Sequence, residues 1–220
     1  MIFENLEVTK WKIPPYPPNK DDKRIVVFWK LPPVFDRFNN STKNKRQMTR
    51  WSTPRLHWFK LNFDGSAQSN CQVGGGVIQE HLGNTVAAYA GNLRNNTVTQ
   101  AEGMALLWGL KMANSIGIKH LEIEGDSQII IDSVKGNALV GWRVEPIMRD
   151  IRCLLVKLED FTIRNIFREG NRAADSMAAD GRLQNGLRCW RDPSLLPVTT
   201  KEILEKEKAF TQEWTVLSTQ

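Results

Sequence analysis

Three strand-like segments follow one another at the start of the folded region, and helical patterns begin only after them. In the first segment Phe59, Leu61 and Phe63 alternate with polar residues, which is the period of a strand with one apolar face. The residues 81–84 form a turn between the second and third segments, and the succession of three strands predicts an antiparallel meander. The predicted strands of this meander span 58–65, 74–80 and 85–93.

The remainder of the pattern alternates between helices and strands. Apolar residues recur at steps of three and four along 99–115, which predicts an amphipathic helix. An α/β domain, in which antiparallel strands precede βα units, is therefore the predicted fold class. The remaining predicted elements are strands at 120–125 and 161–167 and helices at 127–135, 144–158 and 171–181.

Charge and proline content divide the chain into three parts. Residues 1–56 hold seven of the ten prolines and 12 Lys or Arg against 5 Asp or Glu, whereas 57–185 hold 13 against 14. We therefore predict a proline-rich basic arm over 1–56, extended or disordered, followed by the α/β domain over 57–183 and a loosely packed tail over 184–220. A basic arm beside a near-neutral domain suits a polyanionic partner, although a solvated linker explains the same composition.

Other features bear on the compartment of the protein. No run of about 18 apolar residues occurs, so no membrane-spanning helix and no membrane partner are expected. The first residues lack the long apolar segment of a secretory signal peptide. Cys71, Cys153 and Cys189 lie far apart and show neither metal-binding nor disulfide spacing. These features favour a nuclear or cytosolic location.

Four acids at the ends of predicted elements are the candidate functional residues. Asp64 ends the first strand, and Asp126 follows the fourth strand. Glu102 lies in the first turn of the long helix, and Asp175 lies one turn inside the last helix. If the first and fourth strands are neighbours, their acids meet at one edge of the sheet. Clustered carboxylates without Cys or His suit Mg²⁺ or Mn²⁺, and two such ions about 4 Å apart can cleave a phosphodiester.

Each of these acids also has a purely structural explanation. A capping box that begins at Thr99 would give Glu102 the role of capping its own helix. Asp126 could be the N-cap of the next helix, Asp175 a solvated acid beside Arg172, and Asp64 a turn residue. The functional interpretation depends on the four acids occurring together, in this order and on these elements.

Four motifs in register, "FDGS", "AEGMALLWGL", "EGDSQIIIDSV" and "REGNRAADSMA", resemble the type 1 ribonuclease H-like family. The resemblance covers about 57–183 and is greatest to the plant branch, which is related to retrotransposon-encoded reverse transcriptases. It implies a five-stranded mixed sheet, with its first three strands antiparallel and helices on both faces. It also implies metal-dependent endonucleolytic cleavage of RNA paired to DNA.

The family's functional residues can be carried over motif by motif. The resemblance implies that two Mg²⁺ or Mn²⁺ ions are bound by four catalytic acids, Asp64, Glu102, Asp126 and Asp175. The expected contacts to an RNA–DNA hybrid, the implied partner, are Gly65, Ser66, Thr99, Gln128 and Asn171. Such contacts can sense the RNA 2′-hydroxyl group. A monomer is expected.

The chain departs from the family pattern at three places. The family has a histidine six residues before Asn171, and this chain has Asn165 there, which predicts slower turnover with an intact metal site. Val98 and Thr99 replace the paired asparagines of well-studied members, and 136–143 is too short for their basic protrusion. Two alternatives therefore stay open: a domesticated or weakly active nucleic-acid-binding module, and a nuclease of the same superfamily acting on a DNA junction or a 3′ end.

Overall fold

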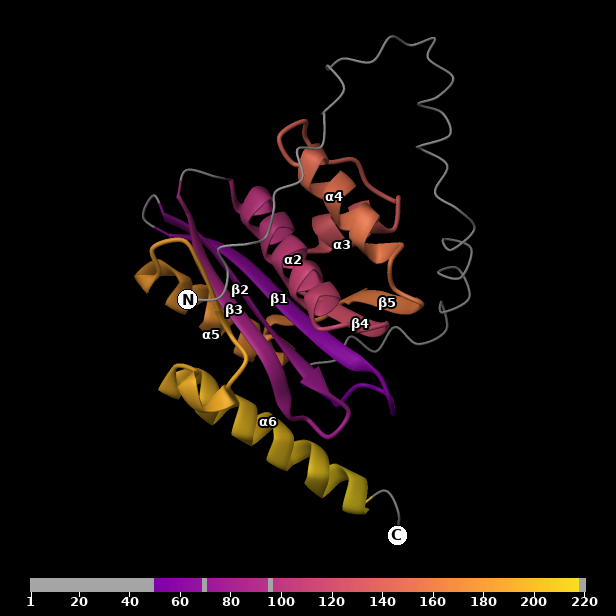
Figure 1. Ribbon diagram of the computed structural model, residues 1–220, viewed down its shortest axis with the longest axis vertical. Helices are drawn as coiled ribbons and strands as arrows, with labels where there is room; N and C mark the ends of the chain where they lie inside the picture. The colour runs from indigo at the N-terminus through magenta and orange to yellow at the C-terminus, as the bar shows by residue number, and fades with distance from the viewer. Residues whose placement is uncertain (1–49, 69–70, 95–96, 218–220) are drawn as a thin grey trace. The chain divides into compact units, whose positions relative to one another are not determined.

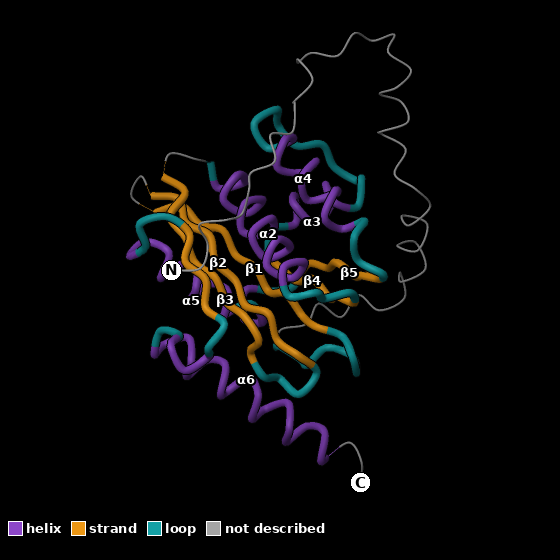
Figure 2. Tube along the Cα trace, in the orientation of Figure 1, coloured by secondary structure: helices purple, strands orange, loops and turns teal. Residues whose placement is uncertain are grey.

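The computed structural model describes residues 50–68, 71–94 and 97–217, and Figures 1 and 2 show how their elements are arranged. The arm predicted over 1–56 therefore lies outside the described residues except for its last seven positions. Within the described ranges, no helix combines the length and the apolar character needed to cross a lipid bilayer.

A six-stranded mixed sheet forms the centre of the domain, in the order β5-β4-β1-β2-β3-β6 (Figure 1). The meander β1-β2-β3 is antiparallel, as predicted, whereas β4 pairs parallel with both β1 and β5. The bounds are β1 Phe59–Gln68, β2 Cys71–Glu80, β3 Thr85–Arg94, β4 His120–Gly125, β5 Asp160–Asn165 and β6 Leu187–Trp190. Because β1 and β4 are parallel neighbours, their carboxyl ends point the same way.

Helices cover both faces of this sheet. Gly74 and Gly75 follow each other in β2, and Gly74 packs against Ala105 of α2 while Gly75 packs against Ala178 of α5. Since successive strand residues point to opposite faces, α2 and α5 lie on opposite faces. The helix α2 also contacts α3 and α4, and α5 contacts α6. The bounds are α2 Val98–Ser115, α3 Gln128–Val134, α4 Glu145–Leu155, α5 Arg172–Asp180 and α6 Val198–Leu217.

The five predicted strands are all present, and the region expected to be a loose tail adds a sixth. The strand β6 pairs antiparallel with β3, with Ala88 opposite Trp190 and Gly91 opposite Leu187. Four residues, of which Arg188 is one, are too few to show a clear apolar alternation, so the sequence did not reveal this strand.

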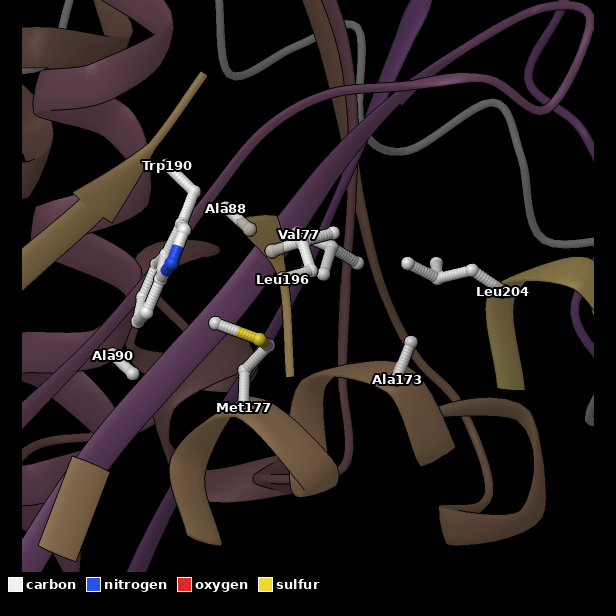
Figure 3. Packing of buried hydrophobic residues seen from close by; sticks show 8 residues of the cluster. All are labelled: Val77, Ala88, Ala90, Ala173, Met177, Trp190, Leu196 and Leu204. Carbon is white, nitrogen blue, oxygen red and sulfur yellow. The ribbon is translucent and has the colours of Figure 1, made fainter. Parts of the chain in front are cut away.

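An apolar cluster holds the C-terminal elements against the sheet (Figure 3). Figure 3 shows the Met177 side chain of α5 lying between Trp190 of β6 and Leu196. Each large apolar side chain buried in this way contributes about 2 kcal/mol. The segment after α5 is therefore part of the folded domain. The members of the cluster are Val77, Ala88, Ala90, Ala173, Met177, Trp190, Leu196 and Leu204.

Candidate metal centre

Asp64 lies in the interior of the sheet rather than in a turn. It belongs to β1, stands opposite Gly75 of β2, and exposes only 4% of its surface. Its Oδ2 atom is buried and has no hydrogen-bond partner among the described residues. A buried polar atom without a partner lowers the stability of the fold. This oxygen is therefore suited to bind a cation or a hydrogen-bond donor from outside the chain.

Glu102 reaches the same place from α2. Its Oε2 atom accepts a hydrogen bond of 3.0 Å from the backbone N–H of Gly65, the residue after Asp64. The capping box of α2 is formed instead by Thr97 and Gln100, so the interpretation of Glu102 as a cap that began at Thr99 is wrong. A methyl group on Gly65 would overlap the backbone of Ala101 and Glu102, so this glycine allows α2 to approach β1.

Asp126 immediately follows β4, the parallel neighbour of β1. Asn62 of β1 is paired with Glu124 of β4, so Asp64 and Asp126 each lie two residues beyond this matched pair. The N-cap residue of α3 is Ser127, which rules out the simpler role proposed for Asp126 as the cap itself.

The three carboxylates form one cluster. Asp64, Glu102 and Asp126 each offer an oxygen, and these oxygens lie within 4.8 Å of one another. Burial, followed by the charges of Asp126 and Asp175, raises the pKa of Asp64 to about 7. Burial and the charge of Asp64 raise the pKa of Glu102 to about 9, and burial also raises the pKa of Asp126. Three mutually repelling acids, one of which has a buried oxygen without a partner, fit a divalent cation with oxygen ligands.

Asp175 lies in the first turn of α5, outside this group of three. Its carboxylate is near enough to raise the pKa of Asp64. Its partner is the guanidinium of Arg168, at 2.7 Å, and not Arg172 as the sequence suggested. The Arg168 charge also acts on Asp64 and Asp126. An exposed cation therefore lies at the rim of the acidic cluster.

The residues expected to contact the hybrid have different surroundings. Gln128 is exposed, and Ser66 and Thr99 are half-buried, so these side chains can be reached from solvent. Gly65 is buried against α2. Asn171 is only 1% exposed and donates a hydrogen bond of 2.9 Å to the Phe63 carbonyl, so its surroundings favour a structural role over direct substrate contact.

Comparison with known families accounts for this arrangement. Residues 62–181 match the family described as reverse transcriptase-like. The chain belongs to this family, and its domain is ribonuclease H-like. The matched range contains all three residues of the acidic cluster and also Asp175.

Relatives of this ribonuclease H-like chain occur in a plant and in an archaeon. It is 28% identical over 136 residues to a candidate ribonuclease H protein of Arabidopsis thaliana, which covers 60% of this chain and 22% of that protein. It is 30% identical over 131 residues to ribonuclease HI of Halobacterium salinarum, which covers 56% of this chain and 62% of that protein. The chain thus spans less than two thirds of each relative.

Solved structures share the ribonuclease H-like fold. Ribonuclease H1 of Halobacterium salinarum aligns with a TM-score of 0.54 at 26% identity, over 57% of this chain and 97% of that chain. LC11 ribonuclease H1, solved in complex with an RNA/DNA hybrid, aligns with a TM-score of 0.53 at 23% identity, over 57% and 99% of the two chains.

Asn165, which occupies the family's histidine position, lies beside the candidate metal centre. It is the last residue of β5 and pairs with Gly125, the residue before Asp126. Its Nδ2 atom is buried and has no hydrogen-bond partner within the described part of the chain. The side chain that the resemblance sets at the family's histidine position therefore lies next to the strand end that leads to Asp126, but it carries no imidazole.

The sequence did not reveal that the polar face of β1 is buried. Lys60 is 0% exposed and Asn62 1% exposed, and they are hydrogen-bonded to Ser52 and Trp51 respectively. Burial alone would raise the pKa of Glu124, but Lys60 and Arg164 lower it below its ordinary value. In two of the predicted strands, lysine or glutamate alternates with apolar residues. A strand whose polar face is open to solvent shows the same pattern, so the sequence alone did not reveal that this polar face is buried.

Proposed function

We propose that this chain is a metal-dependent endonuclease that hydrolyses the RNA strand of RNA–DNA hybrids. The observation that carries the proposal is the convergence of Asp64, Glu102 and Asp126, from three separate elements, on one point within 4.8 Å. Structural acids on a ribonuclease H-like domain need not meet, and their charges oppose one another unless a cation is bound.

The chain's own residues divide the work of the proposed reaction. Asp64, Glu102 and Asp126 would hold Mg²⁺ or Mn²⁺, and Asp175 would complete a site for two ions once it leaves Arg168. The bound metal would supply an activated water and neutralise the charge that develops on the scissile phosphate. We propose Ser66, Thr99 and Gln128 as contacts to the hybrid, because their side chains are accessible beside the cluster-bearing elements.

Two relatives support the choice of substrate. The Halobacterium protein is named ribonuclease HI, and LC11 ribonuclease H1 was solved with an RNA/DNA hybrid. We further propose that the protein acts as a monomer and that its basic residues 1–56 add phosphate contacts, which would make hybrid binding strongly salt-dependent.

The test is cleavage of one labelled sequence prepared as RNA–DNA hybrid, double-stranded RNA, double-stranded DNA and single-stranded RNA. We expect internal cuts confined to the RNA strand of the hybrid, in the presence of Mg²⁺ or Mn²⁺ and not in EDTA. The purified Asp126→Asn variant controls for contaminating nucleases. Cleavage that the variant retains, or cutting of DNA in preference to RNA, would refute the proposal.

A binding module with little cleavage is the second candidate, and Asn165 is the observation that favours it. An imidazole can transfer protons near neutral pH, whereas an amide cannot. If hybrid is bound tightly but left intact in Mg²⁺, the second candidate replaces the first.

Restoring a histidine at this position should speed the reaction. Because Asn165 is in register with Gly125, beside Asp126, we expect Asn165→His to raise kcat by about tenfold or more, with KM and Mn²⁺ affinity unchanged. Single-turnover and steady-state rates between pH 6 and 8 measure this. Asn165→Ala is the matched control, and an equal gain in both variants would show that removal of the asparagine is responsible, not the imidazole.

A further inference from the structure

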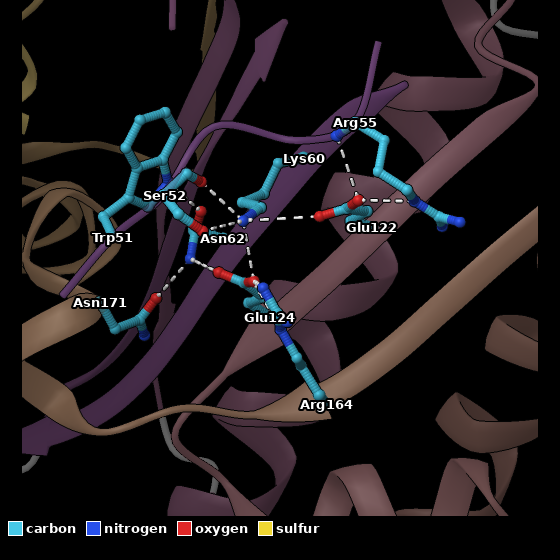
Figure 4. Close-up of polar contacts among 9 residues, drawn as sticks. All are labelled: Trp51, Ser52, Arg55, Lys60, Asn62, Glu122, Glu124, Arg164 and Asn171. Carbon is cyan, nitrogen blue, oxygen red and sulfur yellow. Dashed lines mark hydrogen bonds and ion pairs between the residues drawn. The ribbon is translucent and has the colours of Figure 1, made fainter. Parts of the chain in front are cut away.

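A continuous layer of polar side chains lies on the face of the sheet that carries α5, buried at its centre and exposed at Arg55 and Arg164 (Figure 4). Figure 4 shows that its side chains come from β1, β4, β5, the start of α5 and the segment before β1, and that they point toward one another. We call this set the polar layer. Its members are Trp51, Ser52, Arg55, Lys60, Asn62, Glu122, Glu124, Arg164 and Asn171.

Hydrogen bonds in this polar layer join three elements directly. The Nδ2 atom of Asn62 in β1 donates to Oε2 of Glu124 in β4 and to Oδ1 of Asn171 at the start of α5, each at 3.3 Å. The Nδ2 atom of Asn171 donates to the Phe63 carbonyl of β1 at 2.9 Å. Asn171 therefore ties α5 to β1 through two separate hydrogen bonds.

Each joined residue is close in sequence to one of the acids. Asn62 is two residues before Asp64, and Glu124 is two residues before Asp126. The carbonyl of Asn171 accepts the backbone N–H of Asp175 at 3.0 Å, in the first turn of α5. Residues two apart in a strand share a face, so the polar layer meets each strand on the face that carries the acid.

The stability of the domain does not by itself explain this polar layer. Lys60 is fully buried and bonds Oε1 of Glu124 at 2.9 Å and the Ser52 carbonyl at 2.7 Å. Glu124 is also bonded by Arg164. Removing such charges from water offsets much of their attraction, and apolar side chains of similar volume often stabilise a core at least as well. Hydrogen bonds between buried amides and carboxylates do, however, fix one relative position of the elements that carry them.

We propose that the polar layer aligns β1, β4 and α5 so that Asp64 and Asp126 meet and Asp175 lies beside their cluster, and that Asn171 is its principal positioning residue. This inference rests on the proposed function for its meaning, but it concerns the assembly of the metal centre and not the substrate. The segment 51–55, which precedes the family-matched range 62–181, supplies only outer members of the polar layer, and no hydrogen bond links it to Asn171 within the described residues.

Two variants that both remove buried hydrogen bonds provide the test. Asn171→Leu keeps the approximate volume but removes both hydrogen bonds of Asn171 to β1. Trp51→Phe removes the 3.0 Å bond from Nε1 to the Asn62 side chain and shrinks the ring beside Lys60, but leaves both bonds of Asn171 in place. In the full chain, both should lower the unfolding temperature. Isothermal titration with Mn²⁺ should show affinity at least about tenfold weaker for Asn171→Leu and within about twofold of the parent for Trp51→Phe.

The outcomes separate positioning from simple stabilisation. If Mn²⁺ affinity is unchanged in folded Asn171→Leu, or falls equally in both variants, the positioning role is refuted. Asn171→Ser leaves room for a water molecule and takes the place of the leucine variant if that protein does not fold. Hybrid cleavage by the unmodified protein is measured in parallel: a parent that binds Mn²⁺ but cuts no hybrid refutes the proposed function and leaves the positioning inference to the Mn²⁺ data.

Discussion

Replacing Asp64 by asparagine should abolish cleavage and, at the same time, make the metal-free protein more stable. The loss of one carboxylate from the acidic cluster removes several kcal/mol of metal-dependent stabilisation of the transition state, so kcat should fall at least about a thousandfold. Without metal, the Asp64 charge is buried and faces Asp126 and Asp175, so its removal relieves repulsion.

The stabilisation should depend on pH in a defined direction. The pKa of Asp64 is 3.8 in its ordinary state and about 7 in the fold, so the folded protein holds this proton more tightly than the unfolded chain. Stability contributed by the protonated form is therefore lost as the pH rises from 3.8 to about 7. Asp64→Asn escapes this loss, and its advantage should grow over the same range to about 4 kcal/mol at pH 8.

Urea unfolding in EDTA at pH 5 and pH 8 measures this difference. Asp150→Asn, at an exposed acid of α4, is the control for a change of net charge and should match the parent at both pH values. Addition of Mn²⁺ should reverse the order of stability, because only the parent gains binding energy from the ion. A variant that is less stable than the parent at pH 8 in EDTA would contradict the repulsion assigned to the cluster.

Gly65→Ala should be among the most damaging single-methyl changes in the domain. A Cβ atom at residue 65 would overlap the backbone nitrogen of Glu102, and neither the strand nor the helix can move aside locally. We expect a loss of about 3 kcal/mol or more in the free energy of unfolding. Any folded fraction should bind Mn²⁺ weakly, because separating α2 from β1 breaks the hydrogen bond between Glu102 and the Gly65 backbone.

Gly74→Ala is the matched control for this prediction. Gly74 lies directly opposite Gly65 in the β1–β2 pair and faces the same helix. Its Cβ would lie 3.2 Å from the Ala105 Cβ, 3.3 Å from the Trp108 ring and 3.4 Å from the Ala105 Cα, contacts that a shift of a few tenths of an ångström relieves. We expect about 1 kcal/mol of destabilisation and near-normal cleavage. If urea unfolding shows equal losses for both variants, close approach of α2 at Gly65 does not explain the need for glycine.

Much of the fold could be predicted because its patterns are local. The alternation of Phe59, Leu61 and Phe63 marks a strand wherever it occurs, and the meander follows from the succession of three strands. The strand β6 could not be predicted, because a four-residue edge strand has too few positions to show a period. The docking of α6 could not be predicted either, because it depends on contacts with other elements, such as that of Leu204 with the apolar cluster. Trp190 of β6 is buried because it packs in the same apolar cluster as Met177 of α5, and such a contact between separate elements cannot be read from a local pattern.

For the candidate site, the sequence by itself determined which carboxylates are available and the order of the elements that carry them. Only the tertiary structure decided that Glu102 turns to the Gly65 backbone rather than capping α2, and that Arg168 pairs with Asp175. It also decided that Lys60 and Asn62 are buried, because solvent exposure of a strand face depends on what packs over it. Periodicity records local geometry, whereas burial, repulsion and pKa depend on through-space neighbours that are far apart in the chain.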